Sequence, residues 1–276
     1  MHVRPLFLSL SVLSFAVAAQ SQLTDLQQPT VRGPAAGPSG VVRRADGGTN
    51  GPILQSLFVP PKAGAPFSLT LSTEWTRPLA NGGNWTLVNE RHIMRDSKGR
   101  IYQERWILVP KSGKDKSWMN VFQITDPELH TWFNCEVKAK VCELLNYTLT
   151  TEETYLPAIN PTGALPNGAG FRTHEDLGEG SELGVATHGY RDTTTINAGM
   201  MNDIPMVSLR EFWYSAQLGF NLRSIVDDPQ IGKQVFTVKD LSTAEPDVSH
   251  FDIPADYSIL DHRSESKDAV HPPGTK

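Results

Sequence analysis

The chain has 276 residues, of which 39% are hydrophobic and 20% charged, and its formal net charge is −5. This length suffices for one large or two modest domains with a buried core. The charges are scattered, which excludes the Lys/Arg stripe of a nucleic-acid-binding protein. The 22 glycines and 20 prolines favour a turn-rich β protein.

The first residues, MHVRPLFLSLSVLSFAVAAQSQ, have the pattern of a secretory signal peptide. Arg4 supplies the positive charge, and the apolar run 6–18 is shorter than the ~20 residues of a membrane span. It ends in Ala-Val-Ala, the small-residue spacing of a cleavage site. A short anchoring helix is the competing interpretation. We expect residues 1–18 to be removed and the mature protein, which has no other apolar run of membrane length, to be periplasmic or secreted.

Residues 19–52 are rich in Gln, Pro and Gly without periodicity, and they predict a disordered leader. The folded part then begins with a strand at 67–75, where apolar and polar residues alternate. Residues 87–109 predict two strands joined by a turn at 96–99, with Gly99 in a left-handed conformation. Residues 117–126 predict the next strand.

Cys135 and Cys142 are the only two cysteines, and six residues separate them. This spacing differs from a CxxC redox motif, and no His lies near the pair at zinc-finger spacing. An even number of intervening residues lets the two face each other across a hairpin with its turn at 137–140. We therefore predict a structural disulfide, with free thiols as the alternative. Disulfides persist in oxidising compartments, which agrees with export.

A loop rich in Pro and Gly at 155–170 is the candidate domain boundary or lid. Five more predicted strands follow it, with a polar turn at 178–184 between the first two, and little helix is indicated. The sequence thus predicts a mainly β domain at 53–260, an antiparallel meander that forms a curved open sheet or a half-open β-barrel. Residues 261–276 predict a disordered tail. The five strands predicted after the 155–170 loop lie at 172–178, 185–196, 206–215, 221–227 and 233–241.

Three C-terminal stretches, HEDLG…GVATHGYRDTTTI, REFWYSAQLGFNLRSIVDDPQIGKQVFTVKDL and AEPDVSHFDIPADYSIL, resemble uncharacterised exported proteins abundant in acidobacteria. MRDSKGRIYQERW resembles their N-terminal hairpin, so the likeness covers roughly residues 67–260. That family has no established activity. The final strands and FDIPADY also resemble, more weakly, carriers and sensors of the LolA type. This resemblance implies a half-open antiparallel barrel of the kind that holds lipid-like or acylated ligands in the periplasm.

The sequence contains no GxSxG, HExxH or phosphate-loop motif, so we predict no enzymatic activity, no metal and no cofactor. The histidines are isolated in sequence, and each is predicted to be a sheet-face or loop residue. Distant histidines can still converge in a fold, so a hydrolase with an assembled site stays open as a third hypothesis. The histidines concerned are His92, His130, His174, His188 and His250.

Tryptophans concentrate on the predicted strands, where they serve core packing or line an apolar pocket. The candidate ligand-binding residues are Trp106 and Trp213, followed by Trp75 and Trp85. The leading hypothesis is an exported, non-enzymatic binding module that holds an apolar or lipid-like ligand, or a partner protein, in the bacterial envelope. The second hypothesis is a structural or regulatory envelope protein that contacts another protein through an exposed sheet edge.

Overall fold

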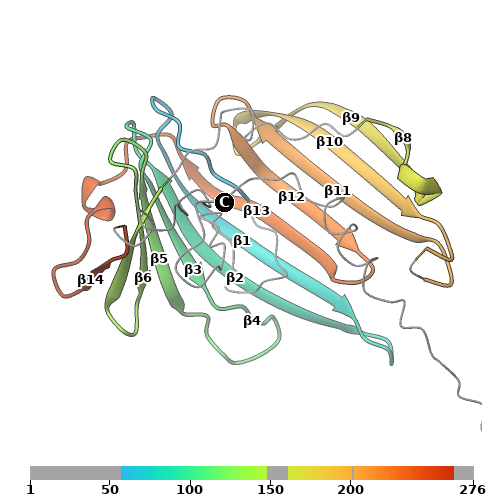
Figure 1. Cartoon of the computed structure of the whole chain (residues 1–276), viewed down its shortest axis with the longest axis horizontal. Helices are drawn as coiled ribbons and strands as arrows, with labels where there is room; N and C mark the ends of the chain where they lie inside the picture. The colour runs from blue at the N-terminus through green and yellow to red at the C-terminus, as the bar shows by residue number, and fades with distance from the viewer. Residues whose placement is uncertain (1–56, 148–160, 201, 264–276) are drawn as a thin grey trace, which may run out of the picture. The chain divides into compact units, whose positions relative to one another are not determined.

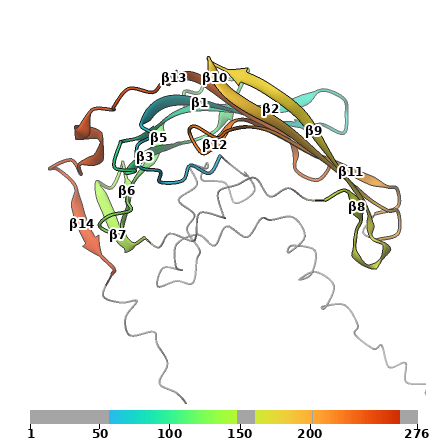
Figure 2. The same cartoon turned by 90° about the horizontal axis from the view of Figure 1, so that it is seen from above.

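The computed structural model describes residues 57–147, 161–200 and 202–263. Within these residues, fourteen strands form one curved, open sheet (Figures 1 and 2). The mainly β fold class is therefore confirmed. The predicted signal peptide, the leader and most of the tail lie outside the described residues, so the domain limits stay predictions.

The strands vary from two to thirteen residues in length. Two short 3-10 segments, η2 (Pro166–Gly168) and η3 (Val248–Phe251), accompany them. The strands are β1 (Phe67–Pro78), β2 (Asn84–Arg95), β3 (Ile101–Trp106), β4 (Val109–Pro110), β5 (Met119–Asp126), β6 (Thr131–Glu136), β7 (Val141–Asn146), β8 (Gly163–Ala164), β9 (Gly170–Glu182), β10 (Val185–Ile196), β11 (Met206–Ser215), β12 (Phe220–Asp228), β13 (Gly232–Ser242) and β14 (Ser258–Asp261).

The sheet is built from two antiparallel meanders, β1 to β7 and β9 to β13, that meet where β1 pairs with β13. The predicted antiparallel meander and curved open sheet are confirmed; the structure adds that the first strand pairs with β13, a strand from the end of the chain. One difference is β14, which pairs with β7 in parallel. Strands remote in sequence therefore lie side by side at the centre of the sheet.

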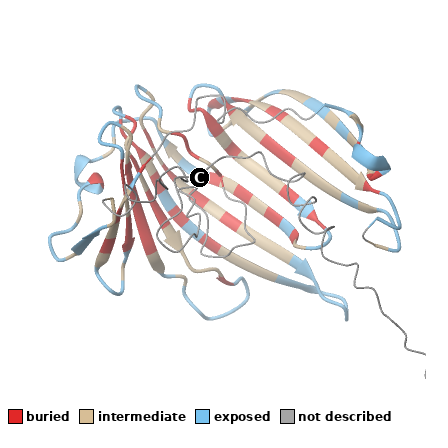
Figure 3. Cartoon of the chain, viewed as in Figure 1, coloured by how far each residue is buried: buried red, intermediate tan, exposed pale blue. Residues whose placement is uncertain are grey.

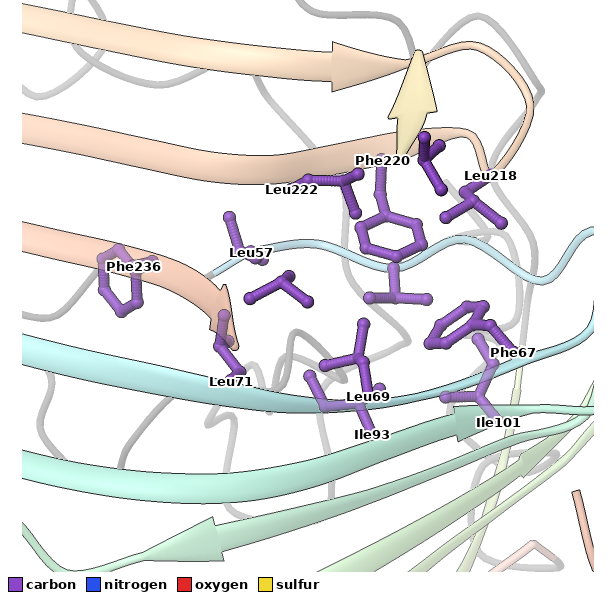
Figure 4. Close-up of a cluster of buried hydrophobic side chains, with 13 residues drawn as sticks. Leu57, Phe67, Leu69, Leu71, Ile93, Ile101, Leu218, Phe220, Leu222 and Phe236 are labelled. Atoms are coloured by element: carbon purple, nitrogen blue, oxygen red, sulfur yellow. The ribbon is translucent and has the colours of Figure 1, made fainter. Parts of the chain in front are cut away.

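The concave face carries the main core, and burial alternates along the central strands (Figure 3). The segment 57–66 lies inside the curve of the sheet (Figure 2). Its residues Leu57 and Val59 share one buried cluster with Leu69 and Leu71 of β1 (Figure 4). Because successive strand residues point to opposite faces, Ser68 and the other even-numbered residues of β1 belong to the convex face.

A second apolar cluster lies on the convex face and contains the cysteines. Cys135 pairs directly with Cys142 across the β6–β7 hairpin, and the two form a disulfide. The turn between these strands falls at 137–140, so both the disulfide and its hairpin are confirmed. Phe251 of η3 and Tyr257 pack on the same cluster, which holds the chain after β13 against this face.

The polar turn predicted at 178–184 is wrong, because β9 continues to Glu182. Only Leu183 and Gly184 form the turn before β10. Gly178 has φ +80° and lies at a bulge in the β9–β10 pairing. Gly180 lies inside the strand, where its missing side chain leaves room for the ring of Trp213. Gly178 thus allows a bulge in the strand, and Gly180 leaves space for a neighbouring ring. Neither glycine ends the strand.

Candidate functional site

A groove with a volume of about 510 Å³ opens on the convex side of β2, β1 and β13. Thr70 and His92 are cross-strand partners there, as are Ser68 and Met94. Leu183, from the turn between β9 and β10, also lines the groove. The lining residues are Ser68, Leu69, Thr70, His92, Met94, Leu183, Lys239, Asp240, Leu241 and Ser242.

The groove exists because the register between β1 and β13 is interrupted. Thr70 pairs with Asp240 but the next residue, Leu71, pairs with Val238, so Lys239 is the extra residue of a bulge. A bulge bends its strand and redirects the side chain of the extra residue. Lys239 forms an ion pair with Glu90 of β2, and both side chains are more than half exposed. Such an exposed pair is worth little, so the Lys239 ammonium can exchange its partner readily.

The His92 ring is held by a buried carboxylate. Glu104 of β3, which is 8% exposed, accepts hydrogen bonds from the His92 backbone N–H at 2.9 Å and from the Trp106 indole N–H at 2.8 Å. The His92 Nδ1 lies 3.0 Å from the same oxygen, and the Tyr102 hydroxyl donates to the other oxygen. Burial first, and then the charge of Glu104, raises the pKa of Tyr102. This network fixes the orientation of the imidazole at the groove.

A hydrolase would also need a hydroxyl within hydrogen-bond reach of the second imidazole nitrogen. The groove contains the hydroxyls of Ser68, Thr70 and Ser242. Among the hydrogen bonds of the described residues, none joins these hydroxyls to His92. The geometry therefore provides the carboxylate and the histidine of the third hypothesis, without an aligned nucleophile in the described part.

The four predicted ligand-binding tryptophans do not converge on one site. Trp75 and Trp85 meet edge to face on the concave side, with ring centroids 5.5 Å apart. Trp213 lies over Gly180 and donates its indole N–H to Glu211 at 3.1 Å. Trp106 is linked to the groove indirectly, through Glu104 and His92. A ligand contact by any of the four stays a prediction.

Two histidines that are isolated in sequence do come together. Tyr190 of β10 stacks on His188 at 4.7 Å and on His174 at 5.7 Å between ring centroids. His174 Nδ1 lies 2.6 Å from Asp192, and His188 lies between Asp176 and Glu179. In the described part of the chain, no group of three or more His, Cys, Asp or Glu has the arrangement of a metal site. Likewise, no helix there is long and apolar enough to cross a membrane.

Sequence reasoning missed the groove, because its walls come from opposite ends of the chain. The register of β1 with β13 could not be derived from either strand alone. One signal was present, namely the Leu-Gly dipeptide at 183–184 between two alternating runs. A two-residue hairpin turn normally carries Asn-Gly or Asp-Gly.

No protein-family model matches the chain, and no curated protein matches it. Distant structural likenesses exist. A MucB crystal structure aligns with a TM-score of 0.34 and 13% identity, over 72% of this chain and 61% of the MucB chain. LprF from Mycobacterium bovis aligns with a TM-score of 0.27 and 12% identity, over 70% of this chain and 90% of LprF.

A LolA superfamily protein from Nitrosomonas europaea aligns with a TM-score of 0.28 and 8% identity, over 68% of this chain and 90% of that protein. The likeness is one of fold. The chain spans about three fifths of the MucB chain, as the 61% coverage shows. Membership of a sequence family stays a prediction.

Proposed function

We propose that this protein is an exported, non-enzymatic binding protein of the bacterial envelope, and that its convex groove takes an apolar or lipid-like ligand. The observation that carries the proposal is the groove itself. Its volume of about 510 Å³ is that of a small-molecule site. It combines the apolar side chains of Met94 and Leu183 with several polar groups, while Leu69 and Leu241, which also border it, pack their side chains on the concave core.

The driving force for such a ligand is the removal of apolar surface from water. An acyl chain gains about 0.8 kcal/mol per buried methylene. About ten buried methylenes would give roughly 8 kcal/mol before the cost of association, which leaves an affinity in the micromolar range or weaker. The disulfide supports a location outside the cytoplasm, because disulfides persist in oxidising compartments.

The test uses the mature chain and a fluorescent fatty-acyl probe, together with native mass spectrometry of the purified protein. Thr70→Trp places an indole in the groove, so we expect it to abolish probe uptake. Ser72→Trp is the matched control, because Ser72 is on the same face of the same strand and does not line the groove. The proposal fails if the wild-type protein takes up no probe and carries no lipid, or if both variants bind equally.

The free edge of β9 favours a second candidate function, recognition of a partner protein by strand addition. Among the described residues, β8 pairs with β9 only at Phe171 and Arg172, so residues 175–182 have no strand on their outer side. Four carboxylates lie along this stretch, those of Glu175, Asp176, Glu179 and Glu182. A basic, extended partner segment would complement them.

Hydrogen exchange with an extended peptide of alternating lysine and valine tests this candidate. Strand addition predicts new protection of the amides at 175–182 and at no other edge. Unchanged exchange at those amides, at peptide concentrations up to the millimolar range, would contradict it.

A further inference from the structure

The turn between β9 and β10 has an unusual residue at its first position. Glu182 pairs with Val185, so the turn consists of Leu183 and Gly184 alone. Their φ angles are +52° and +81°. Positive φ at both central residues defines a type I′ turn, which matches the twist of the flanking strands and strongly favours Asn-Gly.

Leucine is poorly suited to this position. The left-handed conformation costs an ordinary L-residue about 1–2 kcal/mol, and Asn tolerates it far better. The other described non-glycine residues with positive φ are His130, Lys140 and Asn167, so Leu183 is the one apolar residue among them. Leu183 is also 50% exposed, so core packing does not compensate for the backbone conformation. The left-handed backbone conformation and the exposure of the side chain both favour a polar residue at position 183.

The fold holds Leu183 firmly at the wall of the groove. The next strand residue, Val185, is 8% exposed and belongs to the main core, which anchors the base of the hairpin. With Met94 of β2, Leu183 supplies the apolar side chains of the groove. Strained residues that persist at a binding site commonly have a role in binding.

We infer that Leu183 is a ligand-contacting residue, and that it packs on the acyl chain of an anionic amphiphile bound in the groove. This inference rests on the proposed function. The anionic class rests on Lys239, the one Lys or Arg among the lining residues, whose ammonium is paired only with the exposed Glu90 among the described residues; the carboxylate of Asp240 also lines the groove, and the head group must bind on the side of Lys239 away from it. A carboxylate head group can replace Glu90 there, while the acyl chain lies between Leu183 and Met94.

The experiment compares two measurements on the mature chain, the melting temperature and the affinity for a long-chain fatty acid. Leu183→Asn relieves the backbone and removes the apolar contact. We expect it to raise the melting temperature by about 2–4 °C. It should also weaken fatty-acid binding about tenfold, which corresponds to ~1.4 kcal/mol. Leu183→Met keeps an apolar side chain and should bind within about twofold of the wild type.

His130→Asn is the matched control, because His130 has the same φ of +52° and does not line the groove. It should raise the melting temperature without changing affinity. Lys239→Gln should lower the affinity for the fatty acid about fivefold and leave the affinity for the corresponding fatty alcohol unchanged. This last comparison separates the head-group contact from the acyl contact.

The possible results separate the role of Leu183 from the proposed ligand binding in the groove. If the wild-type protein binds neither the fatty acid nor the alcohol, the proposed function fails. If wild type and Ser72→Trp bind, Thr70→Trp does not, and Leu183→Asn binds like the wild type, the groove stands and the role of Leu183 is overturned. A lower melting temperature for Leu183→Asn would overturn the argument from backbone conformation.

Discussion

Arg95 and Phe67 face each other on β2 and β1, and the guanidinium carbon of Arg95 lies 4.9 Å from the Phe67 ring centroid. Arg95 is fully buried, and no carboxylate pairs with it among the described residues. Instead it donates to three backbone carbonyls, those of Pro60 at 2.7 Å, Ala65 at 2.9 Å and Leu218 at 2.7 Å. One cation therefore ties the segment 57–66 and the β11–β12 turn to the central strands.

Replacement of Arg95 by Met should cost about 3 kcal/mol of unfolding free energy. The thioether matches the aliphatic stem, but the buried carbonyls of Pro60 and Leu218 and the part-buried carbonyl of Ala65 lose their donors. An unsatisfied buried group costs about 1–3 kcal/mol. Burial lowers the pKa of Arg95 to about 10, so the side chain is charged at neutral pH and the loss applies there. Urea denaturation measures the change. Arg77→Met, on the exposed end of β1, should stay within about 0.5 kcal/mol of the wild type. An equal loss of unfolding free energy in both variants would contradict a stabilising role for the hydrogen bonds of Arg95.

Removal of the disulfide should destabilise the β6–β7 hairpin. Cys135 and Cys142 close a loop of about eight residues, for which the chain-entropy relation gives roughly 2.5 kcal/mol. The double variant Cys135→Ala, Cys142→Ala should lose about this much free energy of unfolding, with the loss measured against the oxidised wild type. Thiol titration of the protein purified without reductant should detect no reactive sulfhydryl, and two would contradict the prediction.

The alternation of β1 and the spacing of the cysteines were sufficient to predict those elements, because each depends on neighbours within one strand or hairpin. The site was not predictable in this way. Thr70 and Asp240 meet only because β1 pairs with β13, and a pairing between distant strands leaves no local trace. Gly180 was misassigned to a turn for a similar reason. The sequence alone does not distinguish a glycine that makes room for Trp213 inside a strand from a glycine in a turn.

The pairing of His188 with two carboxylates should make the β9 edge most stable in mildly acidic solution. The hydrogen bond to Glu179, and then that to Asp176, raises the pKa of His188 above its ordinary 6.5. The Gly178 N–H, and then His188, lowers the pKa of Asp176 below its ordinary 3.8. Tyr190 stacks on the ring and Tyr214 faces it from β11.

The two groups contribute stability in different pH ranges. The stabilisation from His188 is fully present below about pH 6.5 and is lost as pH rises through its raised pKa. That from Asp176 is present above its ordinary pKa and is lost as pH falls through the lowered one. Amide exchange at 175–182, corrected for intrinsic rates, should therefore be slower at about pH 5.5 than at about pH 8. His188→Gln should remove the difference, and His130→Gln should keep it. No pH dependence in the wild type would contradict the pairing.

The packing of Trp213 on two glycines predicts a steric effect that can be measured by fluorescence. A Cβ at Gly180 would lie 2.5 Å from Cζ3 of Trp213, and a Cβ at Gly189 would lie 2.8 Å from its Cη2. Neither separation is tolerated, so the indole must move off the sheet. Gly180→Ala should cost about 1–3 kcal/mol, as overpacking does, and shift the Trp213 emission to longer wavelength through greater exposure. Gly163→Ala, where a Cβ meets no atom within 4 Å, is the matched control and should leave both measurements unchanged. If Gly180→Ala is equally silent, Trp213 does not rest on the glycines in solution, and its side chain is free to reach a ligand.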